Sequence, residues 1–212
     1  LKQSRQARQE EQKRQAKNQE RNERFRQQAA GLMEISEFQV SRQDIEKLIL
    51  WEELNRENAA DRRCPYSGVQ ISAAMLFSDQ VEIEHILPYS KTLDDSLNNK
   101  TVSMRQANRI KGNRTPWESK NDFAAQGWPT DDMLARAENM PQNKRYRFGE
   151  NGYEKWLRED KDFLARALND TRYLSRVARE YLSLICPQRT RVIPGQMTAL
   201  LRAKFGLNDI LG

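Results

Sequence analysis

Residues 81–117, VEIEHILPYSKTLDDSLNNKTVSMRQANRIKGNRTPW, decide the fold that we predict for this chain. A short apolar strand over Val81 to Leu87 leads into Pro88, which ends the strand because proline cannot donate to a sheet ladder. A polar loop follows, and a second apolar patch covers Val102 to Met104. The next residues predict a helix that carries Asn108. The stretch therefore predicts strand, loop, strand and helix in that order.

The start of this helix has a capping pattern. The Ser103 hydroxyl can accept from the amide three residues on, and Gln106 stands where the return partner of a capping box belongs. Asn108 then lies on the first or second turn, and Lys111 follows on nearly the same face. Thr115-Pro-Trp117 ends the helix, because a residue before proline avoids helical geometry.

Composition and charge favour a partly solvated protein with one modest core. The 212-residue chain is 37% apolar and 31% charged, with a formal net charge of +6. The charge is uneven, because residues 1–28 carry nine Lys or Arg and four Glu. The remainder is close to neutral, so basicity alone supports a nucleic-acid partner only weakly.

The cysteines and the hydropathy exclude several classes of protein. Cys64 and Cys186 lie far apart, which excludes a four-cysteine zinc site within this chain and indicates reduced thiols in an intracellular, cytoplasmic protein. No stretch approaches the roughly 20 apolar residues of a membrane-spanning helix, and there is no signal-peptide pattern. The chain starts at Leu1 inside a helical pattern, and we expect it to be a piece of a longer protein.

Helices are expected on both sides of the central stretch. Residues 2–28 predict a helix that is polar all round, with no face to bury; we expect an exposed linker helix, the alternative being a helix that lies along phosphates. Ser41 and Asp44 start a second helix at Arg42, which should end near Asn58. Residues 64–68 predict a turn, with Gly68 supplying a permissive backbone, and residues 72–77 a single helical turn.

The C-terminal part also predicts helices. Residues 153–167 and 171–186 have helical patterns, residues 191–193 predict a strand, and residues 196–205 a short helix. In the segment 171–186, apolar residues repeat at the spacing of one buried face. These are Leu174, Val177, Ala178, Tyr181, Leu182 and Ile185.

The central stretch carries the groups that phosphodiester hydrolysis needs. His85, the only histidine, is the natural base because imidazole has an ordinary pKa of about 6.5, so its neutral form is populated at neutral pH. Glu84 and Asn108 offer hard oxygen ligands, which suit Mg²⁺ with several retained waters. Lys111 can hold a phosphate oxygen as a point charge.

Adjacent residues on a regular strand point to opposite faces. Glu84 and His85 can therefore serve one site only if the strand breaks or twists there, as Pro88 and the loop after it would allow.

Each of these residues also has a purely structural interpretation. His85 can be a half-buried strand residue, and Asn99 and Asn108 can be turn and cap residues. Asp94-Asp95 can form a second metal site, although this pattern is more typical of a turn. The alternative function is a non-catalytic nucleic-acid-binding or interaction module with a structural Glu-His-Asn set.

The combined motif resembles the HNH domain of the RNA-guided type II CRISPR effector endonucleases, and most closely the compact subtype II-C members. The matching segments cover essentially the whole chain. They include Cys64-x-Tyr66-Ser67-Gly68, Glu84-His85-x-x-Pro88, Asp94-Asp95-Ser96, Asn98-Asn99-Lys100, Asn108-x-x-Lys111-Gly112-Asn113, Asp170-Thr171-Arg172-Tyr173 and Gly195-Gln196-Met197.

The resemblance implies a role for each matching residue. His85 matches the general base, Asn108 the amide metal ligand, Lys111 a phosphate-contacting lysine and Asn99 a residue lining the site. Glu84 stands where many members have Asp, so its arm is one carbon–carbon bond longer, roughly 1.5 Å. The implied catalytic set is thus His85, Asn108 and Glu84, with Glu84 and Asn108 on the metal.

The resemblance also implies the fold and the activity. The fold would be mainly α with a small β-hairpin, an HNH ββα-metal nuclease core surrounded by helices. The activity would be that of a Mg²⁺-dependent DNA endonuclease, with Mn²⁺ as a substitute, that cuts the DNA strand paired to guide RNA. Such a protein serves antiviral defence in the cytoplasm of a prokaryote.

The implied partners are target-strand DNA in an RNA–DNA heteroduplex, guide RNA through the parent effector, the RuvC-like domain of the same parent chain, and a small anti-CRISPR inhibitor protein. We expect residues 1–30 to be a polar linker helix from the RuvC-like domain and residues 31–158 the HNH nuclease domain. Residues 159–212 would form a linker helix and the start of the returning RuvC-like segment.

Overall fold

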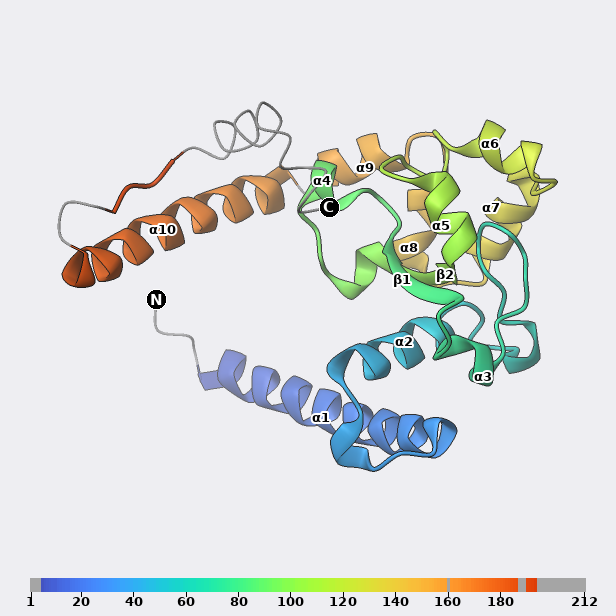
Figure 1. Cartoon of the computed structure of the whole chain (residues 1–212), viewed down its shortest axis with the longest axis horizontal. Helices are drawn as coiled ribbons and strands as arrows, with labels where there is room; N and C mark the ends of the chain where they lie inside the picture. The colour runs from blue at the N-terminus through green and yellow to red at the C-terminus, as the bar shows by residue number, and fades with distance from the viewer. Residues whose placement is uncertain (1–4, 160, 187–189, 194–212) are drawn as a thin grey trace. The chain divides into compact units, whose positions relative to one another are not determined.

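The computed structural model describes residues 5–159, 161–186 and 190–193, and the chain divides into two compact units, Leu1–Glu159 and Asp160–Gly212. The first unit is mainly helical around one small hairpin (Figure 1), which confirms the predicted fold class. Its elements are α1 (Arg5–Met33), α2 (Arg42–Glu52), α3 (Ala73–Leu76), β1 (Val81–His85), α4 (Tyr89–Thr92), β2 (Lys100–Met104), α5 (Arg105–Lys111), α6 (Lys120–Ala125), α7 (Thr130–Glu138), α8 (Gln142–Arg145) and α9 (Gly152–Glu159).

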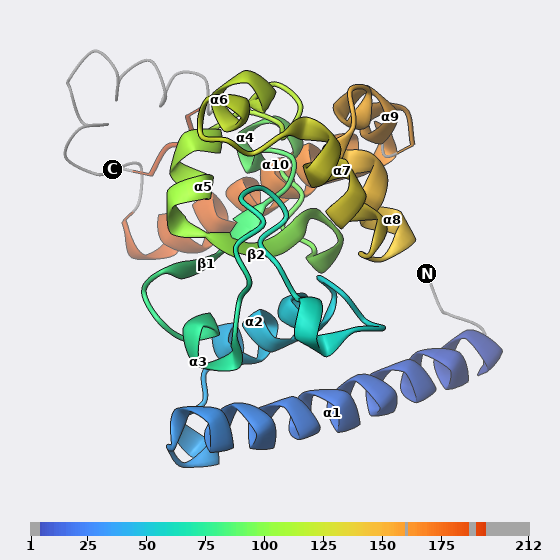
Figure 2. The same cartoon turned by 90° about the vertical axis from the view of Figure 1, so that its right-hand side faces the viewer.

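The hairpin lies at the centre of the first unit. β1 and β2 pair antiparallel, with Val81 opposite Met104 and His85 opposite Lys100. α2 contacts β2, and α5 contacts both strands, so the hairpin has helices on two sides (Figure 2). Strand, loop, strand and helix follow in the predicted order, but β1 ends at His85, two residues earlier than expected.

The predicted capping box at Ser103 is wrong. Ser103 lies inside β2, opposite Glu82, and its buried hydroxyl has no hydrogen-bond partner in the described part of the chain. The ladder keeps Ser103 extended, so α5 begins only at Arg105, whose N–H donates to Gln80 O at 2.8 Å. The helix also ends earlier than predicted, at Lys111, because Gly112 takes a positive φ of 55°.

α1 is a helix, as predicted, but its last turns are buried. Most of its length is exposed, whereas Phe25, Ala29 and Ala30 belong to the core. α1 packs on α2 at this end. The expectation that the helix has no face to bury is therefore wrong for its last turns, because these three small or aromatic residues form a short apolar stripe.

α2 begins as predicted and ends early. Ser41 Oγ accepts from Asp44 N at 3.2 Å and Ser41 N donates to Asp44 Oδ2 at 2.9 Å, which makes a complete capping box. The helix ends at Glu52 rather than near Asn58, since Asn58 is extended and its side chain caps the next turn. The predicted turn with Gly68 is confirmed by a φ of 73°, and the predicted turn after Ser72 by α3.

The second unit contains α10 (Lys161–Ile185), which confirms the predicted helix over residues 171–186. Its predicted buried face is exposed, because no other helix or strand among the described residues of this unit covers it. Leu174, Tyr181, Leu182 and Ile185 are each more than half exposed. The predicted strand at residues 191–193 does not form, and the predicted helix 196–205 lies outside the described residues. No helix in the described part of the chain is long and apolar enough to cross a membrane.

The α2 cap yields a first test. Ser41→Ala removes the acceptor for Asp44 N, so we expect a loss of about 1 kcal/mol in the free energy of unfolding, measured by urea denaturation. Ser41→Asp keeps a side-chain acceptor and is the matched control, with a loss below about 0.5 kcal/mol. Equal losses in both variants would contradict a role for the cap.

Candidate active site

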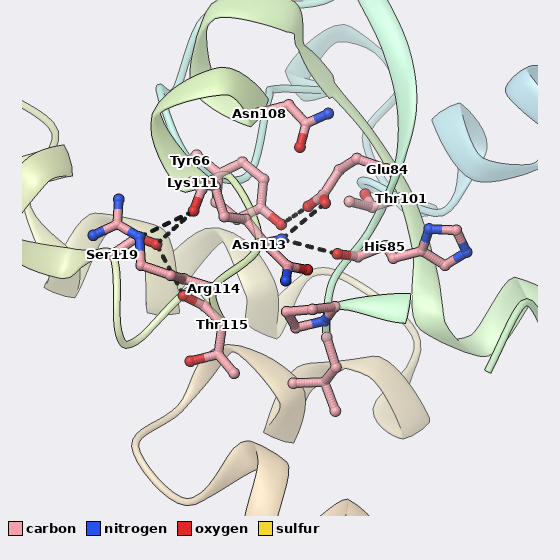
Figure 3. Close-up of polar contacts among 12 residues, drawn as sticks. Tyr66, Glu84, His85, Thr101, Asn108, Lys111, Asn113, Arg114, Thr115 and Ser119 are labelled. Carbon is pink, nitrogen blue, oxygen red and sulfur yellow. Dashed lines mark hydrogen bonds and ion pairs between the residues drawn. The ribbon is translucent and has the colours of Figure 1, made fainter. Parts of the chain in front are cut away.

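The two faces of β1 separate the predicted site residues. Successive strand residues point to opposite sides, so Glu82 and Glu84 share the face that meets α5. His85 is on the other face. Figure 3 shows the Glu84 carboxylate on the side of Lys111 and Tyr66, while the His85 ring points away from them. Although β1 ends at His85, the two side chains do not converge in this structure.

Glu84 is buried in a polar pocket formed by Tyr66 and Lys111. The Tyr66 hydroxyl donates to Glu84 Oε1, and Lys111 Nζ lies 3.1 Å from Glu84 Oε2. Burial raises the pKa of Glu84 to about 7, although the charge and hydrogen bond of Lys111 act in the opposite direction. This carboxylate therefore changes its protonation near neutral pH.

Lys111 joins the helix to both predicted catalytic positions. Its side chain is buried, and Nζ donates to the backbone oxygen of His85 at 3.0 Å besides pairing with Glu84. The amine thus faces inward. In this arrangement the ammonium group of Lys111, which was predicted to contact phosphate, is bonded to Glu84 and His85 of the same chain.

Asn108 lies on the face of α5 that is turned toward β1. Its Nδ2 donates to Glu82 Oε1 at 2.6 Å, and Arg105 Nε is 3.4 Å from Glu82 Oε2. Among the described residues no hydrogen bond to Asn108 Oδ1 is found. The amide oxygen predicted to bind metal is therefore available, and Glu82 orients it.

Asn99 is fully buried and holds the loop between the strands. Its Oδ1 accepts from Leu87 N at 3.0 Å, and its Nδ2 donates to Leu87 O at 2.9 Å and to Asp94 O at 3.0 Å. Every polar atom of the side chain is used by the backbone. The structure thus gives this predicted site-lining residue the position of a brace for the loop.

His85 is half-buried and contacts the loop. Its Nε2 lies 2.8 Å from Asp95 Oδ1, and its ring centroid lies 5.4 Å from that of Tyr89. Asp95 Oδ1 also lies 2.9 Å from Lys100 Nζ. Asp94, in contrast, is buried, with Oδ1 accepting from Ser96 N at 3.0 Å, as a turn residue does.

Sequence reasoning missed three partners of the site. Strand alternation could have predicted Glu82, because it lies two residues from Glu84 and therefore on the same face. Asp95 was considered only as turn or metal chemistry. Tyr66 was noted only as part of the turn at residues 64–68 and was given no role, because only the fold brings that turn onto Glu84. Arg136 of α7 holds the turn by donating to Pro65 O and Tyr66 O.

The donor chemistry fits a hard cation bound mainly by water. The described residues contain no group of three or more His, Cys, Asp or Glu that could hold a metal ion. The amide oxygen of Asn108 accepts no hydrogen bond from the described residues. Both oxygens of the Glu84 carboxylate are bonded, one to Tyr66 and the other to Lys111, and Glu84 would have to exchange such a partner for a cation. A carboxylate and an amide oxygen together suit Mg²⁺, which retains several waters, better than Zn²⁺, which takes nitrogen and sulfur ligands.

The brace formed by Asn99 can be tested with an isosteric change. Asn99→Asp turns the donor toward two carbonyl oxygens into an acceptor, so we expect the free energy of unfolding to fall by about 2–4 kcal/mol in urea denaturation. The neighbouring Asn98 is exposed and accepts from Asn143 at 2.7 Å, so Asn98→Asp is a matched control with little expected change. Equal stability of both variants would exclude the brace.

The buried Glu84 predicts a pH dependence of stability. Its pKa is raised from 4.5 to about 7 by folding, so the folded state keeps a proton that the unfolded state loses. Between these values the wild type should lose stability as pH rises, relative to Glu84→Gln, by up to about 1.4 kcal/mol per pH unit. Urea denaturation of both proteins across this range measures the difference, and a constant difference would contradict the raised pKa.

Comparison with protein families identifies two segments. Residues 64–117 match the HNH endonuclease family, and residues 158–212 match RuvC endonuclease subdomain 3. The first segment contains all five predicted site residues. The second contains the two C-terminal motifs on which the resemblance was based.

Known proteins give the same assignment. The chain is 36% identical over 156 residues to CRISPR-associated endonuclease Cas9 1 of Streptococcus thermophilus, covering 68% of this chain and 14% of the relative. It is 33% identical over 119 residues to Cas9 of Campylobacter jejuni, covering 56% and 12%. A crystal structure of Streptococcus thermophilus Cas9 in complex with the AGAA PAM matches 96% of this chain and 20% of that chain, with a TM-score of 0.59 and 28% identity.

The chain thus spans a small part of the length of these relatives. Its assignment to subtype II-C stays a prediction. The two family matches and the Cas9 relatives agree along the chain, and it therefore belongs to the type II Cas9 family, of which it represents the HNH region.

Proposed function

We propose that this chain is the Mg²⁺-dependent endonuclease module that hydrolyses the DNA strand paired to guide RNA in a type II effector. The observation that carries the proposal is the HNH match over residues 64–117, within which His85 ends β1 and Asn108 lies on α5. The HNH family and the names of the relatives support an endonuclease. The strand, the metal and the residue roles are our proposal.

His85 is the proposed general base. Its side chain is 29% exposed, so a water molecule can reach the ring. A positioned base contributes roughly 10²–10⁴-fold to the rate. No other histidine in the chain can replace it.

We propose that the residues between β1 and α5 hold the metal ion and the phosphate. Glu84 and Asn108 would hold the cation, which would supply charge stabilisation to the phosphate and the leaving oxygen. Glu82 orients the Asn108 amide. Lys111 pairs with Glu84 in this structure. We propose that its ammonium group contacts a phosphate oxygen when Glu84 binds the metal ion instead.

The proposed partners follow from the family. They are target-strand DNA in an RNA–DNA heteroduplex, guide RNA held by the parent effector, and the RuvC-like domain of the same parent chain. In this family sequence choice comes from base pairing with the guide, so the module itself needs only backbone contacts. The exposed cations of α1 are compatible with such contacts.

A strand-cutting assay tests the nuclease. A labelled RNA–DNA hybrid and plain duplex DNA are incubated with wild type or His85→Ala, in Mg²⁺, Mn²⁺ or EDTA, using this chain and the parent effector that contains it. We expect metal-dependent cutting of the DNA strand of the hybrid, reduced at least about 100-fold by His85→Ala because the base is lost. DNA binding by the variant, measured by gel shift, should be unchanged.

The outcomes separate the proposal from its alternative. Cutting that is unchanged in His85→Ala would exclude His85 as the base. Binding without cutting by the wild-type parent effector would favour a non-catalytic nucleic-acid-binding module. Cutting that persists in EDTA would exclude the metal.

A further inference from the structure

We propose that Asp95 is the positioning residue of the base: its carboxylate accepts the Nε2 hydrogen of His85 and so presents Nδ1 to the attacking water. This inference rests on the proposed function, in which His85 is the base. It assigns a role to a loop residue that has none in the HNH chemistry described above.

The contact between the two side chains fixes which ring nitrogen is free. His85 Nε2 lies 2.8 Å from Asp95 Oδ1, a hydrogen-bond distance. A carboxylate can only accept, so in the neutral ring the hydrogen is on Nε2 and the lone pair is on Nδ1. Among the described residues, no hydrogen bond to Nδ1 is found, which leaves that nitrogen for a water molecule.

Asp95 is itself held in place, although its side chain is 66% exposed. Lys100 Nζ lies 2.9 Å from the same Oδ1 atom and 2.9 Å from Glu46 Oε1 on α2. The Lys100 hydrogen bond, together with that of His85, lowers the pKa of Asp95, so the carboxylate is ionised at neutral pH. Glu46, Lys100, Asp95 and His85 thus form a continuous chain of contacts from the core helix to the ring.

The hairpin explains why Asp95 reaches this position. His85 and Lys100 are directly opposite each other in the β1–β2 ladder, and Asp95 belongs to the loop that joins the two strands. The loop is fixed by Asn99, and the carbonyl of Lys100 accepts from Lys144 Nζ at 2.7 Å. The carboxylate is therefore placed over the cross-strand pair by the same register that places the histidine.

The arrangement matches the general logic of an oriented base. A nucleophile's base is commonly held by a third group, which fixes its tautomer and its orientation without itself taking part in proton transfer. The His85 backbone is held by the ladder and by Lys111, and Asp95 fixes the remaining freedom of the ring. Loss of Asp95 should therefore lower the cutting rate without removing the base.

The single histidine makes the test direct. The chain is labelled with ¹³C,¹⁵N-histidine, and NMR records the Nε2–H proton and the ring ¹³C relaxation of His85 in wild type, Asp95→Ala and Asp95→Asn. Asn keeps an oxygen toward His85 and Lys100, with its NH₂ toward solvent. We expect an exchange-protected Nε2–H and a rigid ring in wild type and Asp95→Asn, and loss of both in Asp95→Ala.

The matched control is Asp61→Ala, which removes a partly exposed aspartate outside the hairpin that, among the described residues, pairs with Arg63 alone, at 2.5 Å. It should leave the His85 signals unchanged. A ring that is as rigid in Asp95→Ala as in wild type, or that is mobile in wild type, would overturn the proposal.

Single-turnover cutting by the parent effector supplies the second readout. At saturating substrate we expect Asp95→Ala to slow cutting roughly 10–100-fold, part of the contribution of a positioned base, with unchanged substrate affinity and with recovery in Asp95→Asn. Cutting that His85→Ala abolishes but Asp95→Ala leaves unchanged would reject the role of Asp95 alone. Absence of cutting by the wild type would instead reject the proposed function, while the NMR measurement still decides whether Asp95 holds the ring.

Discussion

One buried ammonium group connects the helix of the HNH region to both residues of its Glu-His pair. Lys111 Nζ pairs with the Glu84 side chain at 3.1 Å and donates to the His85 backbone at 3.0 Å. Burial of two charges costs free energy that good geometry and additional hydrogen bonds must offset. Tyr66 supplies one of these bonds. Burial still raises the pKa of Glu84 to about 7, which shows that the cost is not fully offset. These contacts tie α5 to β1.

The alternation of β1 then distributes the chemistry over two faces. The face toward α5 carries oxygen donors, with Glu82 orienting Asn108 and Lys111 neutralising Glu84. The opposite face carries the His85 ring, which is held from the loop by Asp95. In the proposed function the base and the cation site lie on these two faces and therefore need separate supports. The hairpin provides them, because its register fixes one support and the helix fixes the other.

Local patterns predicted the elements that depend on few residues. The Ser41 cap, the turn at Gly68 and the strand that begins at Val81 all follow from short-range chemistry and are confirmed. Ser103 was predicted wrongly because sheet pairing with Glu82 overrode a sound capping pattern. The apolar face of α10 was predicted as buried from its periodicity alone, but its residues are exposed. Periodicity shows that a helix has a face suited to burial, and it does not show which surface covers that face.

The sequence by itself determined which residues form the candidate site and their order: one histidine after a carboxylate, an amide and a lysine on the next helix, and the loop between them. Residue type and spacing suffice for this, because they state which chemistry is available. Only the tertiary structure decided which groups meet. It joined Tyr66 to Glu84 and Asp95 to His85, and it used Asn99 as a brace. These contacts depend on how the turn, the loop and the hairpin pack, and such long-range geometry leaves no signal in local sequence.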